Sequence, residues 1–168
     1  FLNGYWAVAK PQPRRAFVAV GSNLGHRCDN IRAARDMIAE IPLTCVSNCS
    51  RIYESEPAYY LDQDVFVNAV VLLRTGLAPK ELLGYLHAIE NSLGRVRERE
   101  NGPRTCDIDI IDYQLYVTDN DLLTLPHPRA LERDFVVQPL LELLPSHVLA
   151  DGTPVTCDRV AVGKATRL

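Results

Sequence analysis

Two aspartates in the stretch GPRTCDIDII, Asp107 and Asp109, have the side-chain type and the spacing for binding metal ions. On a β-strand, residues two apart point to the same face, so these carboxylates would lie side by side with their Cα atoms about 6.6 Å apart. Two Mg²⁺ ions about 3.5–4 Å apart fit such a pair while bridging phosphate oxygens. A solvated strand face is the alternative, but Asp is a poor strand former. The pattern predicts a metal site at Asp107 and Asp109. Asp112 is an odd number of residues from them on the strand, so it would point to the other face, and we expect it at the surface.

A group of arginines lies directly before this pair, in a loop that also carries Glu98 and Glu100. Its members are Arg95, Arg97, Arg99 and Arg104. The planar guanidinium donates hydrogen bonds in a fork that matches phosphate, and several forks in one loop can converge on one polyphosphate. Charge runs are usually solvated, but this one adjoins the paired carboxylates. The combination favours phosphoryl-type transfer, which depends on positioning and charge neutralisation.

A third candidate is His127, held between two prolines in LPHPR and followed by Arg133 and Phe135. Its restricted backbone suits contact with a phosphate or a ribose, with a capping or surface role as the alternative. A fourth is the pair Phe66 and Asn68, two apart on an expected strand and therefore on one face. An aromatic ring beside an amide suits a flat, polar heterocycle, and ordinary core packing of Phe66 is the alternative.

Other nucleotide and hydrolase motifs are absent. GSNLG at 21–25 lacks the Gly-Lys-Ser/Thr ending of a P-loop, and a tight strand-to-helix turn explains it better. There is no Gly-x-Ser-x-Gly elbow, and the four histidines do not form metal-ligand pairs.

The elements that must position these residues follow from apolar periodicity. Short apolar or alternating runs predict strands, and stripes at helical spacing predict helices. We expect strands near 16–22, 44–54, 66–74 and 106–117, and helices ending at Pro42, spanning Pro79 to Gly94, and near 136–145. The order predicts an α+β, ferredoxin-like βαββαβ core with an antiparallel sheet, helices on one face and a C-terminal extension. The remaining face would be free for a ligand.

Composition narrows the class of protein. The 168 residues, 47% hydrophobic and 23% charged, suit one globular domain. The net charge of -3 argues against general nucleic-acid binding. No apolar run approaches the roughly 20 residues of a membrane span, and five cysteines without a CxxC pair suggest reduced thiols. We therefore expect a cytoplasmic protein with no nucleic-acid or membrane partner.

Taken together, these motifs resemble one family, the 6-hydroxymethyl-7,8-dihydropterin pyrophosphokinases of folate synthesis. The similarity covers residues 17 to about 145, through VGSNLG, YESEP, DQDVFVNAV, IENSLGRVR, GPRTCDIDII, LPHPR and ERDFVVQPL. It implies transfer of pyrophosphate from ATP to the hydroxymethyl group of the dihydropterin, with release of AMP. Residues 16–168 would form this domain. Residues 1–15 would be a linker or the remnant of a fusion, because members of the family occur fused to other folate-pathway enzymes.

The resemblance also implies roles for individual residues. Asp107 and Asp109 would hold two Mg²⁺ ions and, with Arg95 and Arg104, form the catalytic group. The ATP-binding residues would be Glu90, Arg95, Arg104, His127 and Arg133. The pterin-binding residues would be Ser55, Glu56, Ala58, Phe66, Asn68 and Phe135, with Phe66 and Phe135 on the two faces of the ring. Gln63 matches a further position of the pattern.

The chain departs from the family pattern at several positions. Tyr59 stands where members usually have Gly, so the loop from Glu56 to Gln63 is expected to differ in conformation. The basic residue that members often have just before Gly-Pro-Arg is absent here, or Arg99 takes its place. Asp112 stands at a position that is commonly apolar, and Gln114 at one that is commonly Gly.

Two other functions remain as alternatives. A non-catalytic ferredoxin-like module would bind RNA or a protein through the open sheet face, but would not need the paired carboxylates. A two-metal phosphohydrolase would use the same carboxylates with water in place of the pterin.

Overall fold

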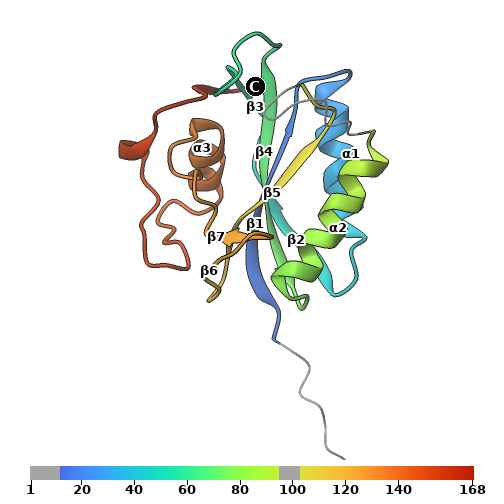
Figure 1. Cartoon of the computed structure of the whole chain (residues 1–168), viewed down its shortest axis with the longest axis vertical. Coiled ribbons are helices and arrows are strands. Elements are labelled where there is room, and N and C mark those ends of the chain that lie inside the picture. The colour runs from blue at the N-terminus through green and yellow to red at the C-terminus, as the bar shows by residue number, and fades with distance from the viewer. Residues whose placement is uncertain (1–11, 95–102) are drawn as a thin grey trace, which may run out of the picture.

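The core is one antiparallel sheet built from strands far apart in the sequence (Figure 1). The computed structural model describes residues 12–94 and 103–168. The main elements are β1 (Arg14–Ser22), α1 (Arg27–Ala39), β2 (Thr44–Cys49), β3 (Tyr53–Ser55), β4 (Phe66–Thr75), α2 (Pro79–Ser92) and β5 (Asp107–Tyr113). They are followed by β6 (Thr118–Asp119), β7 (Thr124–Leu125), α3 (Asp134–Leu143) and β8 (Ala165–Arg167). The expected α+β class and βαββαβ order are confirmed.

The strand order is β5-β1-β4-β3-β8, and β2 also pairs with β4. The single strand expected at 44–54 is two strands, because the chain leaves the sheet between Cys49 and Tyr53 and returns to the same neighbour. β5 ends at Tyr113, earlier than expected, because Leu115 adopts a positive φ of 59° that no strand continues through.

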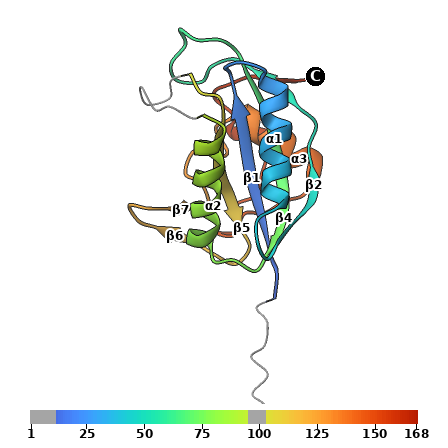
Figure 2. The same ribbon diagram turned by 90° about the vertical axis from the view of Figure 1, so that its right-hand side faces the viewer.

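Helices α1 and α2 cover one face of the sheet, as the periodicity predicted (Figure 2). Alternate residues of the central strands, such as Val18 and Val20, point toward them and pack with Ile38 and Leu86. Val18 and Val20 lie on β1, which is paired with β4 on one side and with β5 on the other.

The opposite face is not free, which corrects the expectation of an open sheet. The C-terminal extension forms α3, which lies on the side opposite α1 and α2 in Figure 1. A second apolar cluster there includes Phe17, Val70, Ile111, Val137 and Leu140. Because the cluster covers only part of this face, a ligand site is confined to the part that α3 leaves open.

Asp112 is buried, which contradicts its expected surface position. The β1–β5 register shifts between Phe17 and Val18, so Asp112 pairs with Phe17 and the parity counted from Asp107 no longer holds. The Asp112 carboxylate contacts Nε2 of His147 at 2.8 Å and accepts a hydrogen bond from the Ala150 amide at 2.9 Å. The pair ties β5 to the C-terminal extension. Within the two described ranges, no helix is both long and apolar enough to span a membrane.

Candidate functional site

The floor of the candidate site is a row of residues across three strands. Gly21 of β1 pairs with Asn68 of β4 on one side and with Asp107 of β5 on the other. Two positions along, Ala19 pairs with Asp109. Small residues on the middle strand leave space above the sheet, flanked by an amide on one side and carboxylates on the other.

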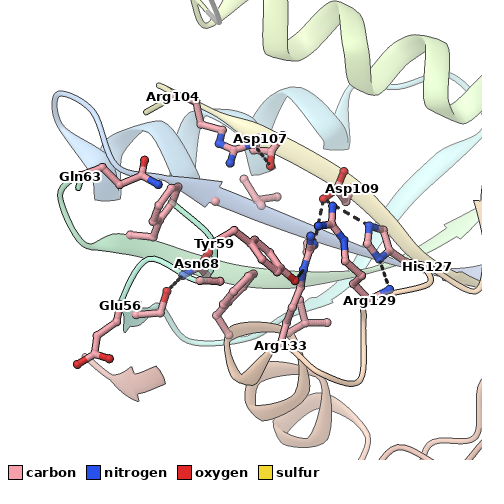
Figure 3. A pocket seen from close by; sticks show the side chains of 18 residues that line it. Glu56, Tyr59, Gln63, Asn68, Arg104, Asp107, Asp109, His127, Arg129 and Arg133 are labelled. Carbon is pink, nitrogen blue, oxygen red and sulfur yellow. Dashed lines mark hydrogen bonds and ion pairs between the residues drawn. The ribbon is translucent and has the colours of Figure 1, made fainter. Parts of the chain in front are cut away.

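A cavity of about 470 Å³ lies over this floor (Figure 3). Its walls come from the loop after β3, the start of β4, the start of β5 and the segment from His127 to Val136. It brings together most of the residues that the motifs singled out: Ser55, Glu56, Ala58, Phe66, Asn68, Arg104, Asp107, Asp109, His127, Arg133 and Phe135. Arg95, Arg97 and Arg99 lie outside the described residues.

Both strand carboxylates face positive side chains. Nη1 of Arg104 donates to Oδ2 of Asp107 at 2.8 Å, and both side chains are mostly shielded from solvent. Nη1 of Arg133 lies 3.7 Å from Oδ2 of Asp109, and Nε2 of His127 lies 4.0 Å from the same oxygen. The site therefore pairs acceptors for a cation with donors for an anion, an arrangement suited to a metal-bound polyphosphate.

His127 is neutral at physiological pH. Burial, together with the charges of Arg133 and Arg129, lowers its pKa from 6.5 to about 4, against an opposing effect of Asp107. Its Nδ1 accepts a hydrogen bond from the Arg129 amide at 3.1 Å. The hydrogen of the neutral ring is therefore on Nε2, which can donate it to an acceptor in the cavity.

The other half of the cavity is aromatic and amide-rich. Nδ2 of Asn68 donates to Oγ of Ser55 at 2.8 Å, which fixes the orientation of the amide. The rings of Phe66 and Phe135 line the same space. Each ring lies 5.7 Å from a guanidinium carbon, that of Arg104 for Phe66 and that of Arg133 for Phe135. These arginines connect the aromatic half to the carboxylates.

Within residues 12–94 and 103–168, the cavity lining does not include Glu90, in contrast to most of the expected ATP-binding residues. It lies on α2, 2% exposed, and its Oε1 accepts a hydrogen bond from the Ile108 amide at 2.7 Å. Ile108 separates Asp107 from Asp109, so Glu90 holds the backbone that carries both carboxylates.

Asn23 was missed as a site residue, although it lies within GSNLG. It is 2% exposed, and its Oδ1 accepts from the Arg104 amide at 2.8 Å. Its Nδ2 donates to Oε1 of Gln63 at 3.0 Å and to the carbonyl of Asp64 at 3.1 Å. One buried amide thus joins the loop before β4 to the segment before β5. An Asn inside a strand-to-helix turn is the only sequence signal for this, and it fits capping equally well.

The C-terminal residues, expected only as an extension of the core, support the site from behind. Gly163 has a φ of +64°, and a β-carbon there would overlap the ring of Phe135. The Glu56 amide donates to the carbonyl of Lys164, and the Ala165 amide donates to Oδ2 of Asp134 at 2.8 Å. The tail therefore packs behind the aromatic half of the cavity.

Two more cavity residues lie outside the expected set, Tyr59 and Arg129. The sequence marks Tyr59 only as a departure from the family pattern, and Arg129 as one of two guanidiniums expected near His127. The Arg129 guanidinium carbon lies 4.7 Å from the Tyr59 ring centre. The two residues are 70 positions apart in the chain, so sequence patterns do not reveal this contact.

An antiparallel α+β domain with strand carboxylates, converging guanidiniums and an aromatic pocket has the features of a polyphosphate-handling enzyme. The family model for 7,8-dihydro-6-hydroxymethylpterin-pyrophosphokinase (HPPK) matches residues 17–145. The chain belongs to this family.

Individual relatives agree with this assignment. The chain is 42% identical over 128 residues to a Bacillus subtilis protein named 2-amino-4-hydroxy-6-hydroxymethyldihydropteridine pyrophosphokinase, covering 76% of this chain and 77% of that one. It is 41% identical over 129 residues to the folic acid synthesis protein fol1 of Pneumocystis carinii, covering 76% of this chain but 17% of the relative. The chain thus spans less than a fifth of that fungal protein's length.

A solved structure shows the same fold. The wild-type HPPK-DHPS of Plasmodium falciparum matches with a TM-score of 0.68 at 13% sequence identity. The match covers 88% of this chain and 44% of that one.

Proposed function

We propose that this chain transfers pyrophosphate from ATP to the hydroxymethyl group of 6-hydroxymethyl-7,8-dihydropterin, releasing AMP. The observation that carries the proposal is the shared floor of the cavity, in which Asn68 and Asp107 lie in one row on either side of Gly21. Neighbouring strands are about 4.8 Å apart, so the Cα atoms of Asn68 and Asp107 are about 10 Å apart across the sheet. A pterin and the phosphates of ATP can then meet over β1.

The aromatic half binds the pterin. Phe66 and Phe135 take its two faces, and the Asn68 amide, oriented by Ser55, pairs with donors and acceptors on its edge. Main-chain groups from Ser55 to Ala58 complete the recognition of the ring. This holds the hydroxymethyl group toward β5.

The charged half binds ATP. Arg104 and Arg133, which contact the carboxylates in this structure, are within reach of a polyphosphate placed beside those carboxylates. His127 donates from Nε2 to a phosphate or ribose oxygen without adding charge. We also assign Arg95 to the ATP-binding residues, because the family motif implies this role. Fixing both reactants in one cavity supplies orientation, and the guanidiniums stabilise charge during transfer.

The carboxylates fit magnesium. No group of three or more His, Cys, Asp or Glu side chains within 12–94 and 103–168 forms a ready-made metal site. Mg²⁺, however, is usually held by one or two carboxylates together with substrate phosphates, which is the donor set that Asp107, Asp109 and ATP provide. Two bound ions would neutralise phosphate charge and acidify the acceptor hydroxyl.

The cellular setting is also a proposal. The five cysteines are free thiols, as expected in a reducing compartment such as the cytoplasm. Fusion to a second folate-pathway enzyme is supported by relatives. Proteins of pea and Arabidopsis are named as bifunctional folate synthesis proteins, and the Plasmodium falciparum structure is an HPPK-DHPS.

The direct test measures AMP release from Mg²⁺-ATP with and without 6-hydroxymethyl-7,8-dihydropterin. We expect AMP only when the pterin is present, in equal amount with a pterin pyrophosphate ester identified by its mass. Asp109→Asn should lower kcat by about 10²–10³-fold, because a charge that acts in the transition state is lost. Asp158→Asn, a change at an exposed aspartate of the C-terminal extension, is the matched control and should leave turnover unchanged.

Release of phosphate or pyrophosphate without the pterin would instead support a hydrolase. Absence of turnover from a folded wild-type chain would support a binding module. Either result would overturn the proposed reaction.

A further inference from the structure

Tyr59 lines the cavity, and its hydroxyl contacts two residues of the segment that follows LPHPR. It donates to Oε1 of Glu132 at 2.6 Å and accepts from Nε of Arg133 at 3.1 Å. These partners are 73 and 74 residues away along the chain. One phenol therefore joins the loop after β3 to the start of α3, as Figure 3 shows for Tyr59 and Arg133.

The aromatic ring of Tyr59 also contacts two guanidinium groups, those of Arg129 and Arg133. The guanidinium carbons of Arg129 and Arg133 lie 4.7 Å and 5.4 Å from the ring centre. An aromatic face attracts such cations, by about 0.5–1 kcal/mol at exposed sites and more when they are desolvated. Together with Glu132, the ring offsets the repulsion between two positive groups that share one wall of the cavity.

These contacts set the direction of Arg133. Its Nε is held by the Tyr59 hydroxyl, while its Nη1 lies 3.7 Å from Asp109. A guanidinium restrained at one edge presents its other edge to the cavity with less loss of rotamer freedom on binding. Tyr59 itself is 38% exposed, so core packing does not account for its position.

We propose that Tyr59 is a positioning residue that holds Arg129 and Arg133 ready to bind the phosphates of the nucleotide. The inference rests on the proposed function in taking ATP as the ligand of these arginines. It assigns Tyr59 a role in nucleotide binding through its contacts with these two arginines.

The test compares the binding of α,β-methylene-ATP with Mg²⁺ to the wild type, Tyr59→Phe and Tyr59→Ala by calorimetry. We expect Tyr59→Ala to weaken binding about 5–20-fold, and Tyr59→Phe, which keeps the ring but loses the hydroxyl, about 2–5-fold. The affinity for the pterin alone should stay within about twofold. Leu61→Ala, a change at a 72% exposed residue of the same loop, is the matched control and should bind the analogue as the wild type does.

A double-mutant cycle with Arg133→Ala separates positioning from general loosening of the loop. In the Arg133→Ala background, Tyr59→Ala should cost clearly less analogue affinity than in the wild type. Thermal unfolding of each variant reports whether it is folded, and Tyr59→Phe keeps the test available if Tyr59→Ala does not fold.

Two results would overturn the inference: unchanged analogue affinity in both Tyr59 variants, or a loss confined to the pterin. The proposed function is judged separately, by pterin-dependent AMP release from the wild type. A wild type that binds the analogue through Tyr59 but lacks this turnover would leave the inference standing and remove the proposed reaction.

Discussion

Oδ1 of Asn68 lies 3.0 Å from the position that a β-carbon on Gly21 would take. The Asn68 amide is held on its other side by Ser55, at 2.8 Å from Nδ2 to Oγ. Gly21 also lies directly between Asn68 and Asp107 in the sheet. The absence of a side chain at this one position therefore allows the two halves of the cavity to meet.

Gly21→Ala should impair pterin binding more than ATP binding. The added methyl group must push the Asn68 amide back by a few tenths of an ångström, which strains its hydrogen bond to Ser55. We therefore expect the KM for the pterin to rise by up to about tenfold, the upper limit corresponding to the loss of about one hydrogen bond. Steady-state kinetics with each substrate varied in turn measures the effect. Gly84→Ala is the control, because Gly84 lies on α2 and, apart from the helix's own backbone and chain neighbours, no atom lies within 4 Å of the added carbon. This variant should be neutral or slightly stabilising. Equal KM changes for both substrates would contradict the expectation.

Glu90→Ala should destabilise the protein and lower kcat, although Glu90 does not line the described cavity. Its loss leaves the buried Ile108 amide without this acceptor, at a cost of about 1–3 kcal/mol in the free energy of unfolding. Glu90→Gln keeps an acceptor oxygen, so its free energy of unfolding and its kcat should both be close to those of the wild type. Urea denaturation and turnover are the measurements. If Glu90→Gln folded as stably as the wild type but bound the ATP analogue much more weakly, Glu90 would act on the nucleotide through its charge.

Stability should fall as the pH is lowered from 6.5 toward 4, in part through His127. Its pKa is lowered to about 4 in the folded protein, so between these values the unfolded chain binds more protons and acid favours unfolding. From pH 7 to pH 4.5 this group should cost about 2 kcal/mol. His127→Asn should lose less stability than the wild type over this range, measured by denaturant unfolding in metal-free buffer. Parallel losses in both proteins would contradict the assignment.

Gly163→Ala should raise the KM for the pterin, because the new carbon would overlap the ring of Phe135. The positive φ of Gly163 adds backbone strain of about 1–2 kcal/mol to any such variant. Gly152→Ala separates the two effects, because Gly152 also has a positive φ but no atom within 4 Å of an added carbon. Both variants should be less stable, and only Gly163→Ala should change the pterin KM. A similar KM change in Gly152→Ala would show that strain alone is responsible.

The order of the helices and strands, and the residue types that make up the site, can be predicted from the sequence alone. Apolar periodicity predicts α1, α2 and the central strands because their side chains repeat at intervals set by local geometry. The spacing of Asp107 and Asp109 likewise predicts that they share a face, and the structure brings both into one cavity.

The neighbours of these residues in space follow from the folded chain and not from local sequence. Parity predicts a surface position for Asp112, but a register shift against β1 buries it against His147. The row from Asn68 through Gly21 to Asp107, the contact of Tyr59 with Arg133 and the packing of Gly163 on Phe135 each join segments far apart in the chain. Local periodicity carries no information about such pairs, because they form only when the strands take one register and the C-terminal extension packs onto the sheet.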